Sequence, residues 1–154
     1  MSQLSNFTFD EITIGQSAEY SKAVTEADIQ MFAAVSGDVN PLHLDPEFAA
    51  GTRFGERIAH GMLTASFISA ALAMELPGPG CIFMEQSLKF RLPVKIGDVI
   101  TVKLTVTDMQ ARRTTLTLDC KAYNQHEKLV LTGTSVVIAP EEKLVLDRPA
   151  VPGS

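Results

Sequence analysis

The segment AVSGDVNPLHLDP, residues 34–46, places a carboxylate and an imidazole five residues apart. Asp38 can accept hydrogen bonds as a carboxylate, and His43 is of the residue type that gives or takes a proton near neutral pH. Pro41 fixes its own φ angle and favours an extended conformation for Asn40, so the loop presents its side chains with little backbone freedom. The sequence therefore predicts a rigid loop that holds a proton-transferring pair.

The same residue types also fit a purely structural role, because Asp and Asn are common turn formers in segments rich in Gly and Pro. A second cluster, RIAHGMLTAS at residues 57–66, favours a functional interpretation. His60 and Gly61 open a predicted helix there, and unpaired N–H groups at a helix start can stabilise negative charge on a substrate oxygen. Together the two clusters suit proton transfer next to a carbonyl group.

The expected helices lie in the first half of the chain. Thr25 is a plausible N-cap for an amphipathic helix that Gly37 ends, and Asp45 or Pro46 starts a short helical turn that closes at Gly51. A long helix begins near His60 and runs through HGMLTASFISAALAMEL until PGPG, residues 77–80, breaks it. This helix is apolar on nearly every side, which predicts a central position.

The second half of the chain has the alternation and β-branched residues that are typical of strands. Four strands are expected in CIFMEQSLKFRLP, DVITVKLTVTDM, RTTLTLDCKAYN and KLVLTGTSVVIA, with a further one near residues 17–24. Consecutive strands favour an antiparallel meander. We therefore predict an α+β fold in which a curved antiparallel sheet wraps one long apolar helix, and exposed sheet edges favour a dimer.

Composition restricts the classes of partner. At 154 residues, 45% of them hydrophobic, the chain is expected to form one domain over residues 1–154, with a loosely ordered Pro-rich tail from about residue 141. The net charge of −5 and the pI near 5.1 argue against nucleic acid and anionic membranes. No apolar run reaches the roughly 18 residues of a membrane span. Cys81 and Cys120 in apolar segments, without a signal-peptide pattern, predict reduced thiols in the cytoplasm.

The segment FAAVSGDVNPLHLDPEFAA, residues 32–50, closely resembles the characteristic segment of the (R)-specific enoyl-CoA hydratases, the hydratase 2 or MaoC-like family. That segment has Ser-Gly-Asp followed by Asn-Pro-Leu-His. The resemblance extends over RIAHGMLTAS, LPGPG, QSLKFRLPVKIGD and the closing strands, hence over most of the chain. In length and layout the chain is similar to the short bacterial enzymes that supply (R)-3-hydroxyacyl-CoA for polyhydroxyalkanoate synthesis.

The resemblance implies a hot-dog fold, a homodimer with joined sheets, and syn addition of water to a trans-2-enoyl-CoA without a cofactor or metal. It implies that Asp38 and His43 are the catalytic pair. Ser69 matches a serine that hydrogen-bonds the catalytic carboxylate, and the Gly61 N–H matches the donor to the thioester oxygen. Asn40 would shape and brace the site.

Binding of an acyl-CoA needs an apolar slot and cations for the phosphates. Candidates for the slot, most of which also fit core packing, are Met62, Leu63, Phe67, Leu72, Phe83 and Met84. Candidate cations are Arg53, Arg57, Lys89, Arg91 and Lys95.

Other functions remain open from the sequence. A hot-dog acyl-CoA thioesterase would direct water at the thioester carbonyl, and a non-catalytic acyl-binding module would use the same pocket without turnover. A metal site built from Asp38, His43, Asp45 and His60 fits no standard zinc spacing, and Asp45 is explained as a helix cap. A triad with Ser36 lacks a nucleophile elbow.

Overall fold

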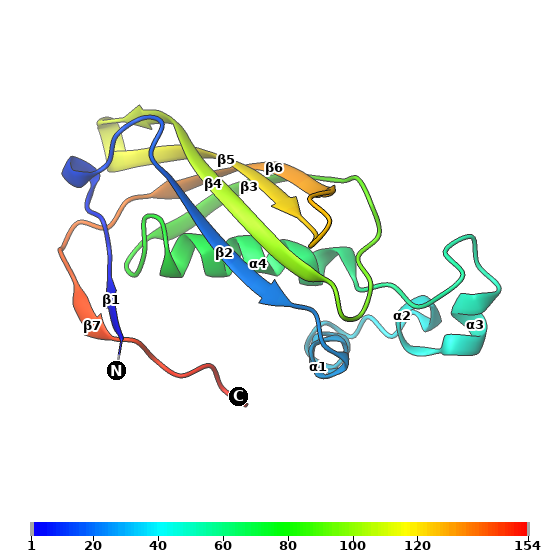
Figure 1. Cartoon of the computed structure of the whole chain (residues 1–154). Helices are drawn as coiled ribbons and strands as arrows, with labels where there is room; N and C mark the ends of the chain where they lie inside the picture. Colours follow the sequence, from blue (N-terminus) through cyan, green and yellow to red (C-terminus); the bar gives the residue numbers. More distant parts are fainter. Residues whose placement is uncertain (1, 154) are drawn as a thin grey trace.

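A computed structural model describes residues 2–153 as a curved sheet wrapped around one long helix (Figure 1). Five strands form an antiparallel sheet in the order β2-β4-β5-β6-β3. Their bounds are β2 Ser17–Ala23, β3 Ile82–Phe90, β4 Val99–Gln110, β5 Thr115–Tyr123 and β6 Leu129–Ile138. The helices are α1 Glu26–Ser36, α2 Pro41–Leu44, α3 Pro46–Ala50 and α4 Gly61–Met74, with 3-10 turns η1 Phe9–Glu11 and η2 Arg112–Thr114. The predicted α+β hot-dog arrangement is confirmed.

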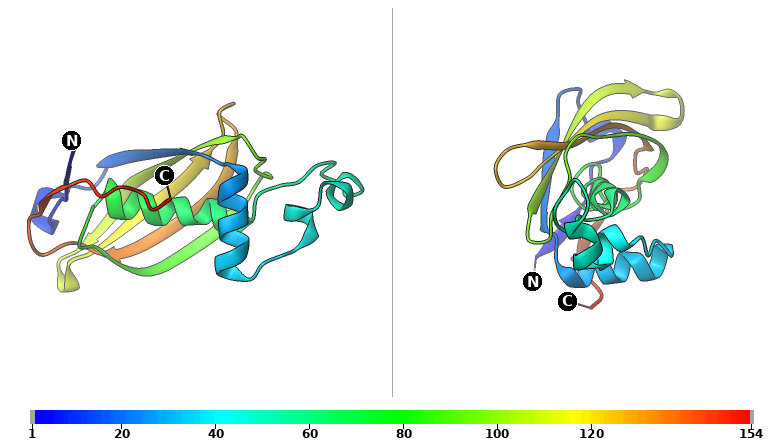
Figure 2. Two further views of the ribbon diagram at one scale, coloured as in Figure 1. Left: turned by 90° about the horizontal axis from the view of Figure 1, so that it is seen from below. Right: turned by 90° about the vertical axis from the view of Figure 1, so that its right-hand side faces the viewer.

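Helix α4 lies along the concave face of the sheet, as seen from below in Figure 2. Alternate residues of β4, among them Val102 and Leu104, are fully buried, and Ile68 and Leu72 of α4 belong to the same apolar core. Burying each such side chain contributes about 1.5–3 kcal/mol. This packing fixes α4, and therefore fixes the position of its first turn.

The helix boundaries follow the residues that cap them. Thr25 and Asp28 form a capping box at the start of α1, and Gly37 ends that helix at a φ of 79°. Asp45 caps α3 by accepting hydrogen bonds from two backbone N–H groups. These boundaries agree with the prediction, as do the start of α4 after His60 and the positions of the four long strands.

Three features differ from the prediction. The strands do not form a simple meander, because β3 pairs with β6 at the far edge and leaves β4, β5 and β6 as the consecutive part. The predicted loop around His43 contains the short helix α2, which Pro41 begins. The tail is also more ordered than expected, because β7 (Val145–Asp147) pairs with β1 (Gln3–Ser5).

The tail is held in place by a buried amide. The Asn6 side chain, which is fully buried, donates to the Pro79 and Glu142 carbonyls and accepts from the Leu144 N–H. A composition-based prediction misses this contact because it joins residues more than 130 positions apart.

Helices α1, α2 and α3 gather at the end of the molecule where α4 begins, opposite the β1–β7 pair (Figure 1). Both cysteines are free, as predicted. Within residues 2–153, no helix has the length and apolar character needed to cross a membrane.

Candidate active site

Asp38 lies in the turn that joins α1 to α2, where local hydrogen bonds fix its backbone and its carboxylate. The Ser36 hydroxyl accepts from the Asp38 N–H at 3.1 Å. The Asn40 N–H donates to Asp38 Oδ1 at 3.2 Å, and the Asn40 side chain in turn accepts from the Leu42 N–H at 3.1 Å. Asn40 therefore caps α2 and braces the carboxylate at the same time.

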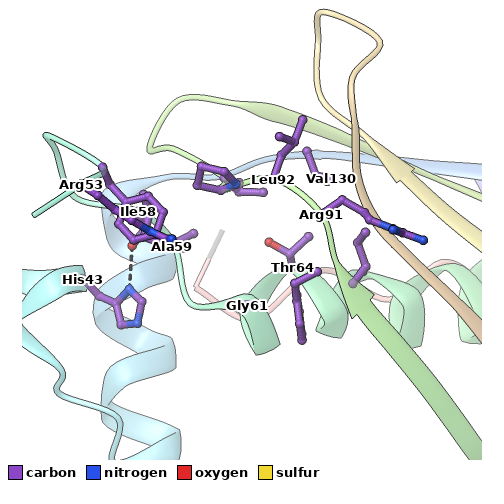
Figure 3. A pocket seen from close by; sticks show the side chains of 14 residues that line it. His43, Arg53, Ile58, Ala59, Gly61, Thr64, Arg91, Leu92 and Val130 are labelled. Carbon is purple, nitrogen blue, oxygen red and sulfur yellow. Dashed lines mark hydrogen bonds between the residues drawn. The ribbon is translucent and has the colours of Figure 1, made fainter.

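His43 projects from α2 and is 8% exposed. Its Nδ1 lies 2.7 Å from the Ile58 carbonyl oxygen, the contact drawn as a dashed line in Figure 3. A carbonyl can only accept, so Nδ1 carries the proton of this hydrogen bond. In the neutral ring Nε2 is then unprotonated and can accept a proton or a hydrogen bond.

His60 is the residue that connects Asp38 and His43. It is 1% exposed, and its Nε2 lies 3.0 Å from the backbone carbonyl oxygen of Asp38. Its ring lies against the His43 ring, with centroids 4.0 Å apart and planes 31° apart. Its Nδ1 is buried and has no hydrogen-bond partner among residues 2–153.

The polar atoms of these three residues converge. One potential ligand atom each from Asp38, His43 and His60 lie within 4.8 Å of one another. These are atoms of the kind that bind a metal or a water molecule. The structure leaves Asp45 out of this cluster, because its carboxylate accepts from the Glu47 and Phe48 N–H groups.

A cavity of about 240 Å³ opens beside the cluster, and His43, Gly61 and Thr64 line it (Figure 3). The rest of its wall is mostly apolar and includes Phe54, Ile58, Phe90, Leu92, Val94, Val130 and Leu131. Thr64 is 3% exposed, and its hydroxyl has no hydrogen-bond partner in the described chain. The hydroxyl oxygen faces the hollow in Figure 3.

Sequence reasoning missed Thr64 and named Ser69 as the functional hydroxyl of this helix. The sequence does contain a sign of this residue: a Thr stands three positions after Gly61, in the first turn of the long helix. The Ser66 hydroxyl is turned back on the Leu63 carbonyl oxygen, the structural role that is common for Ser in helices.

Gly61 is the first residue of α4, and its N–H makes no hydrogen bond with the described residues. A Cβ at this position would lie 2.9 Å from Cε1 of Phe90. The glycine therefore allows the Phe90 ring to pack against the helix start and leaves the N–H available to a ligand.

Comparisons with known proteins identify the family of the chain. A family model for the MaoC-like domain matches residues 10–127. The chain belongs to the MaoC-like family. It is 45% identical to the (R)-specific enoyl-CoA hydratase of Rhodospirillum rubrum, over 86% of this chain and 91% of that protein.

Two solved structures extend the likeness of this MaoC-like protein to its fold. The unliganded R-hydratase from Pseudomonas aeruginosa has a TM-score of 0.93 and 46% identity, with 99% of this chain and 98% of that one covered. The R-hydratase from Aeromonas caviae, which is involved in PHA biosynthesis, has a TM-score of 0.81 and 45% identity, with 84% and 98% covered.

Ser69 is placed differently from what the family resemblance implies. It lies on the exposed face of α4, two turns beyond Gly61, and makes no hydrogen bond with Asp38 within the described chain. Ser69 lies eight positions after Gly61, which is about 12 Å along the helix axis. The expected contact between Ser69 and the catalytic carboxylate is therefore not made within one copy of this MaoC-like chain.

The expected slot residues are spread over the molecule. Leu72 is 1% exposed and Leu63 is 6% exposed, so both are core residues, whereas Met62 is 55% exposed. Leu63 and Phe67 line a second, open cavity of about 370 Å³ beside α1. The cavity that His43 lines is instead bounded by Phe54, Phe90 and Leu92. Phe83 and Met84 are exposed on β3.

The candidate cations divide into paired and unpaired groups. Arg57 pairs with Glu26 at 2.7 Å, and Lys95 pairs with Glu56 at 3.3 Å. Arg53 and Arg91 line the cavity wall of the MaoC-like site. The two arginines are thus better placed than Arg57 and Lys95 to meet an anionic ligand.

Proposed function

We propose that this MaoC-like protein is an (R)-specific enoyl-CoA hydratase, which adds water reversibly to a trans-2-enoyl-CoA and forms an (R)-3-hydroxyacyl-CoA. The observation that carries the proposal is the convergence of the Asp38 carboxylate and the His43 imidazole beside an apolar cavity. The relative from Rhodospirillum rubrum supports the same reaction. The proposed role is to supply polyhydroxyalkanoate synthesis from fatty acid β-oxidation, and the relative from Aeromonas caviae, which is involved in PHA biosynthesis, supports the first part of this role.

The mechanism begins with the thioester carbonyl. A 2-enoyl thioester is electrophilic at C3 only as far as negative charge can move onto the carbonyl oxygen. The unpaired Gly61 N–H at the start of α4 is placed to donate to that oxygen. The Thr64 hydroxyl faces the same cavity and is free to donate a second hydrogen bond.

Water attacks C3 from the side that carries Asp38 and His43. The carboxylate and the unprotonated Nε2 hold this water between them. The pair removes one proton from the water and delivers a proton to C2 on the same face, which gives syn addition. Because the two groups are so close, they share the roles of acid and base.

We propose that the active form is a homodimer joined at β3. This edge strand leaves a row of backbone groups unpaired, and its side chains Ile82, Phe83, Met84 and Phe90 are 42–55% exposed. A second copy would cover these groups and could bring a second Ser69 to Asp38. Sedimentation equilibrium tests the proposal: a dimer mass that a Met84→Asp change halves is expected, and a wild-type monomer with full activity would contradict it.

No cofactor is proposed apart from the coenzyme A of the substrate, for whose phosphates Arg53 and Arg91 are the proposed contacts. We place the enzyme in the cytoplasm, where its two free thiols stay reduced. Exhaustive chelation should leave activity unchanged. Activity that is lost and then restored by a divalent metal would instead assign the Asp38, His43 and His60 cluster to a metal.

Turnover of crotonyl-CoA tests the function and separates it from its rivals. Hydration removes the enoyl absorbance and releases no free thiol. Release of thiol would indicate a thioesterase, which would direct the same water at the carbonyl carbon. Saturable binding without any turnover would indicate an acyl-binding module.

A further inference from the structure

His60 has no role in the mechanism above, yet it contacts both members of the catalytic pair. Its side chain makes no cap hydrogen bond to α4, although it stands at the N-cap position. Instead it reaches back to the Asp38 carbonyl oxygen and lies against the His43 ring. A residue needed only to begin the helix would make the cap contact.

The hydrogen bond fixes the tautomer of His60. The Asp38 carbonyl oxygen can only accept, so the proton of this bond is on Nε2. A second proton on Nδ1 would be buried without an acceptor, because that atom has no partner among residues 2–153. His60 therefore holds its proton on Nε2, whereas His43 holds its proton on Nδ1.

The two neighbouring histidines consequently have opposite tautomers, and each tautomer has a different consequence for the site. His43 is turned so that its unprotonated Nε2 is available to water. His60 is turned so that its Nε2–H holds the backbone of Asp38. The ring of His60 also contacts the Phe32 ring of α1, with centroids 4.9 Å apart, which restricts its movement further.

We propose that His60 is a positioning residue of the catalytic pair. Its Nε2–H fixes the backbone of Asp38 and its ring supports that of His43, so that the carboxylate and the free imidazole nitrogen face the same water. The inference rests on the proposed hydratase function, because it assigns His60 to that chemistry. A core residue that only fills volume would support the fold but would not orient the catalytic pair.

Two variants separate positioning from packing. His60→Leu keeps an apolar side chain of comparable reach but removes the donor, and we expect kcat to fall about 10–100-fold with KM within about 3-fold. His60→Gln carries an amide N–H that reaches the Nε2 position, so it should recover most of kcat. His126→Gln is the matched control, because His126 is exposed on the turn between β5 and β6.

Equal kcat in folded His60→Leu and wild type would overturn the proposal, and so would a His60→Gln variant no more active than His60→Leu. If His60→Leu does not fold, the His60→Gln variant decides: kcat near that of wild type supports the proposal, and kcat below about a tenth of it overturns it.

Nitrogen-15 spectra of histidine-labelled wild-type protein test the positioning without any turnover. Above neutral pH, His43 and His60 should show single and opposite tautomers, whereas exposed His126 should show a mixture. A His60 signal with the proton on Nδ1 would contradict the proposal. Absence of crotonyl-CoA turnover in the wild type, by contrast, would overturn the hydratase function while the spectra still report on the histidine pair.

Discussion

Two clusters of polar side chains, one on the sheet and one at the start of α4, differ in whether their polar atoms have hydrogen-bond partners. On the sheet, the Ser135 hydroxyl donates to the Gln86 side chain and lies 2.9 Å from the Cys120 sulfur. The side-chain amide of Gln86 donates to the Ser87 backbone carbonyl oxygen. The side-chain polar atoms of this group are therefore all paired. At the start of α4, the Nδ1 of His60 and the hydroxyl of Thr64 are both buried and have no partner.

The difference separates structure from function. Buried polar atoms are nearly always hydrogen-bonded, so an unpaired one needs an explanation. Within residues 2–153, His60 and Thr64 carry the only buried side-chain polar atoms that lack a partner, and Thr64 faces the cavity that His43 also lines. We therefore infer that the paired group on the sheet stabilises the fold, whereas the unpaired group belongs to the proposed active site.

The largest loss of activity is expected for a change at the proposed catalytic carboxylate, which lies beside the unpaired cluster. Asp38→Asn should lower kcat for crotonyl-CoA by about 10²–10⁴-fold, because it removes a proton-transferring group. Steady-state kinetics measures this loss, and the midpoint of thermal unfolding should hardly change. Asp45→Asn is the matched control in the same segment, because Asn caps a helix as well as Asp does. An active Asp38→Asn variant would remove the distinction between the two regions.

The paired region should give the opposite result. Ser135→Ala removes the shared partner of Gln86 and Cys120 and leaves the half-buried side-chain carbonyl oxygen of Gln86 without this donor, which costs about 1 kcal/mol of unfolding free energy. Urea denaturation measures the loss. Its kcat and KM should match those of the wild type, and a large fall in kcat would place Ser135 in the site.

Thr64→Val sharpens the comparison, because it should keep or raise stability while it lowers catalytic efficiency. The change keeps the shape and removes a buried hydroxyl that has no partner, so the unfolding free energy should stay equal or rise. Loss of one hydrogen bond to the thioester oxygen should lower kcat/KM about 2–10-fold. An unchanged kcat/KM together with a loss of stability would show that the hydroxyl is satisfied within the protein.

The smallest effect concerns pH. Burial raises the pKa of the Cys120 thiol above its ordinary value of 9.0, although hydrogen bonds from Ser135 and Gln86 act in the other direction. As pH rises above 9.0, the Cys120 thiol of the unfolded chain loses its proton while that of the folded chain keeps it. The contribution of Cys120 to the unfolding free energy is therefore present below pH 9.0 and is lost as pH rises further. The difference in unfolding free energy between wild type and Cys120→Ala should shrink as pH rises. A difference that grows with pH would contradict the raised pKa.

The sequence predicted those features that depend on neighbouring residues. Thr25, Gly37 and Asp45 marked helix boundaries through contacts with residues a few positions away, and the alternation of apolar residues located four strands. The segment that holds Asp38 and His43 was identified for the same reason. These are local effects, which a single sequence can carry.

The features that escaped prediction depend on contacts across the fold. The pairing of β3 with β6, in place of β4, joins segments that lie far apart in the sequence. The contact of His60 with Asp38 spans 22 positions, and the free hydroxyl of Thr64 is recognisable only once the cavity is seen. The position of Ser69 shows the same limit, because only the folded chain reveals that Ser69 makes no hydrogen bond with Asp38 among the described residues.

The most direct test of the central claim is the stereochemistry of hydration. Crotonyl-CoA converted in D2O by the wild-type protein should give 3-hydroxybutyryl-CoA of (R) configuration at C3, with deuterium at C2 on the same face as the hydroxyl group. We expect that result because the proposed proton-transferring pair, Asp38 and His43, acts from one side of the substrate. An (S) product, or deuterium on the opposite face, would contradict it.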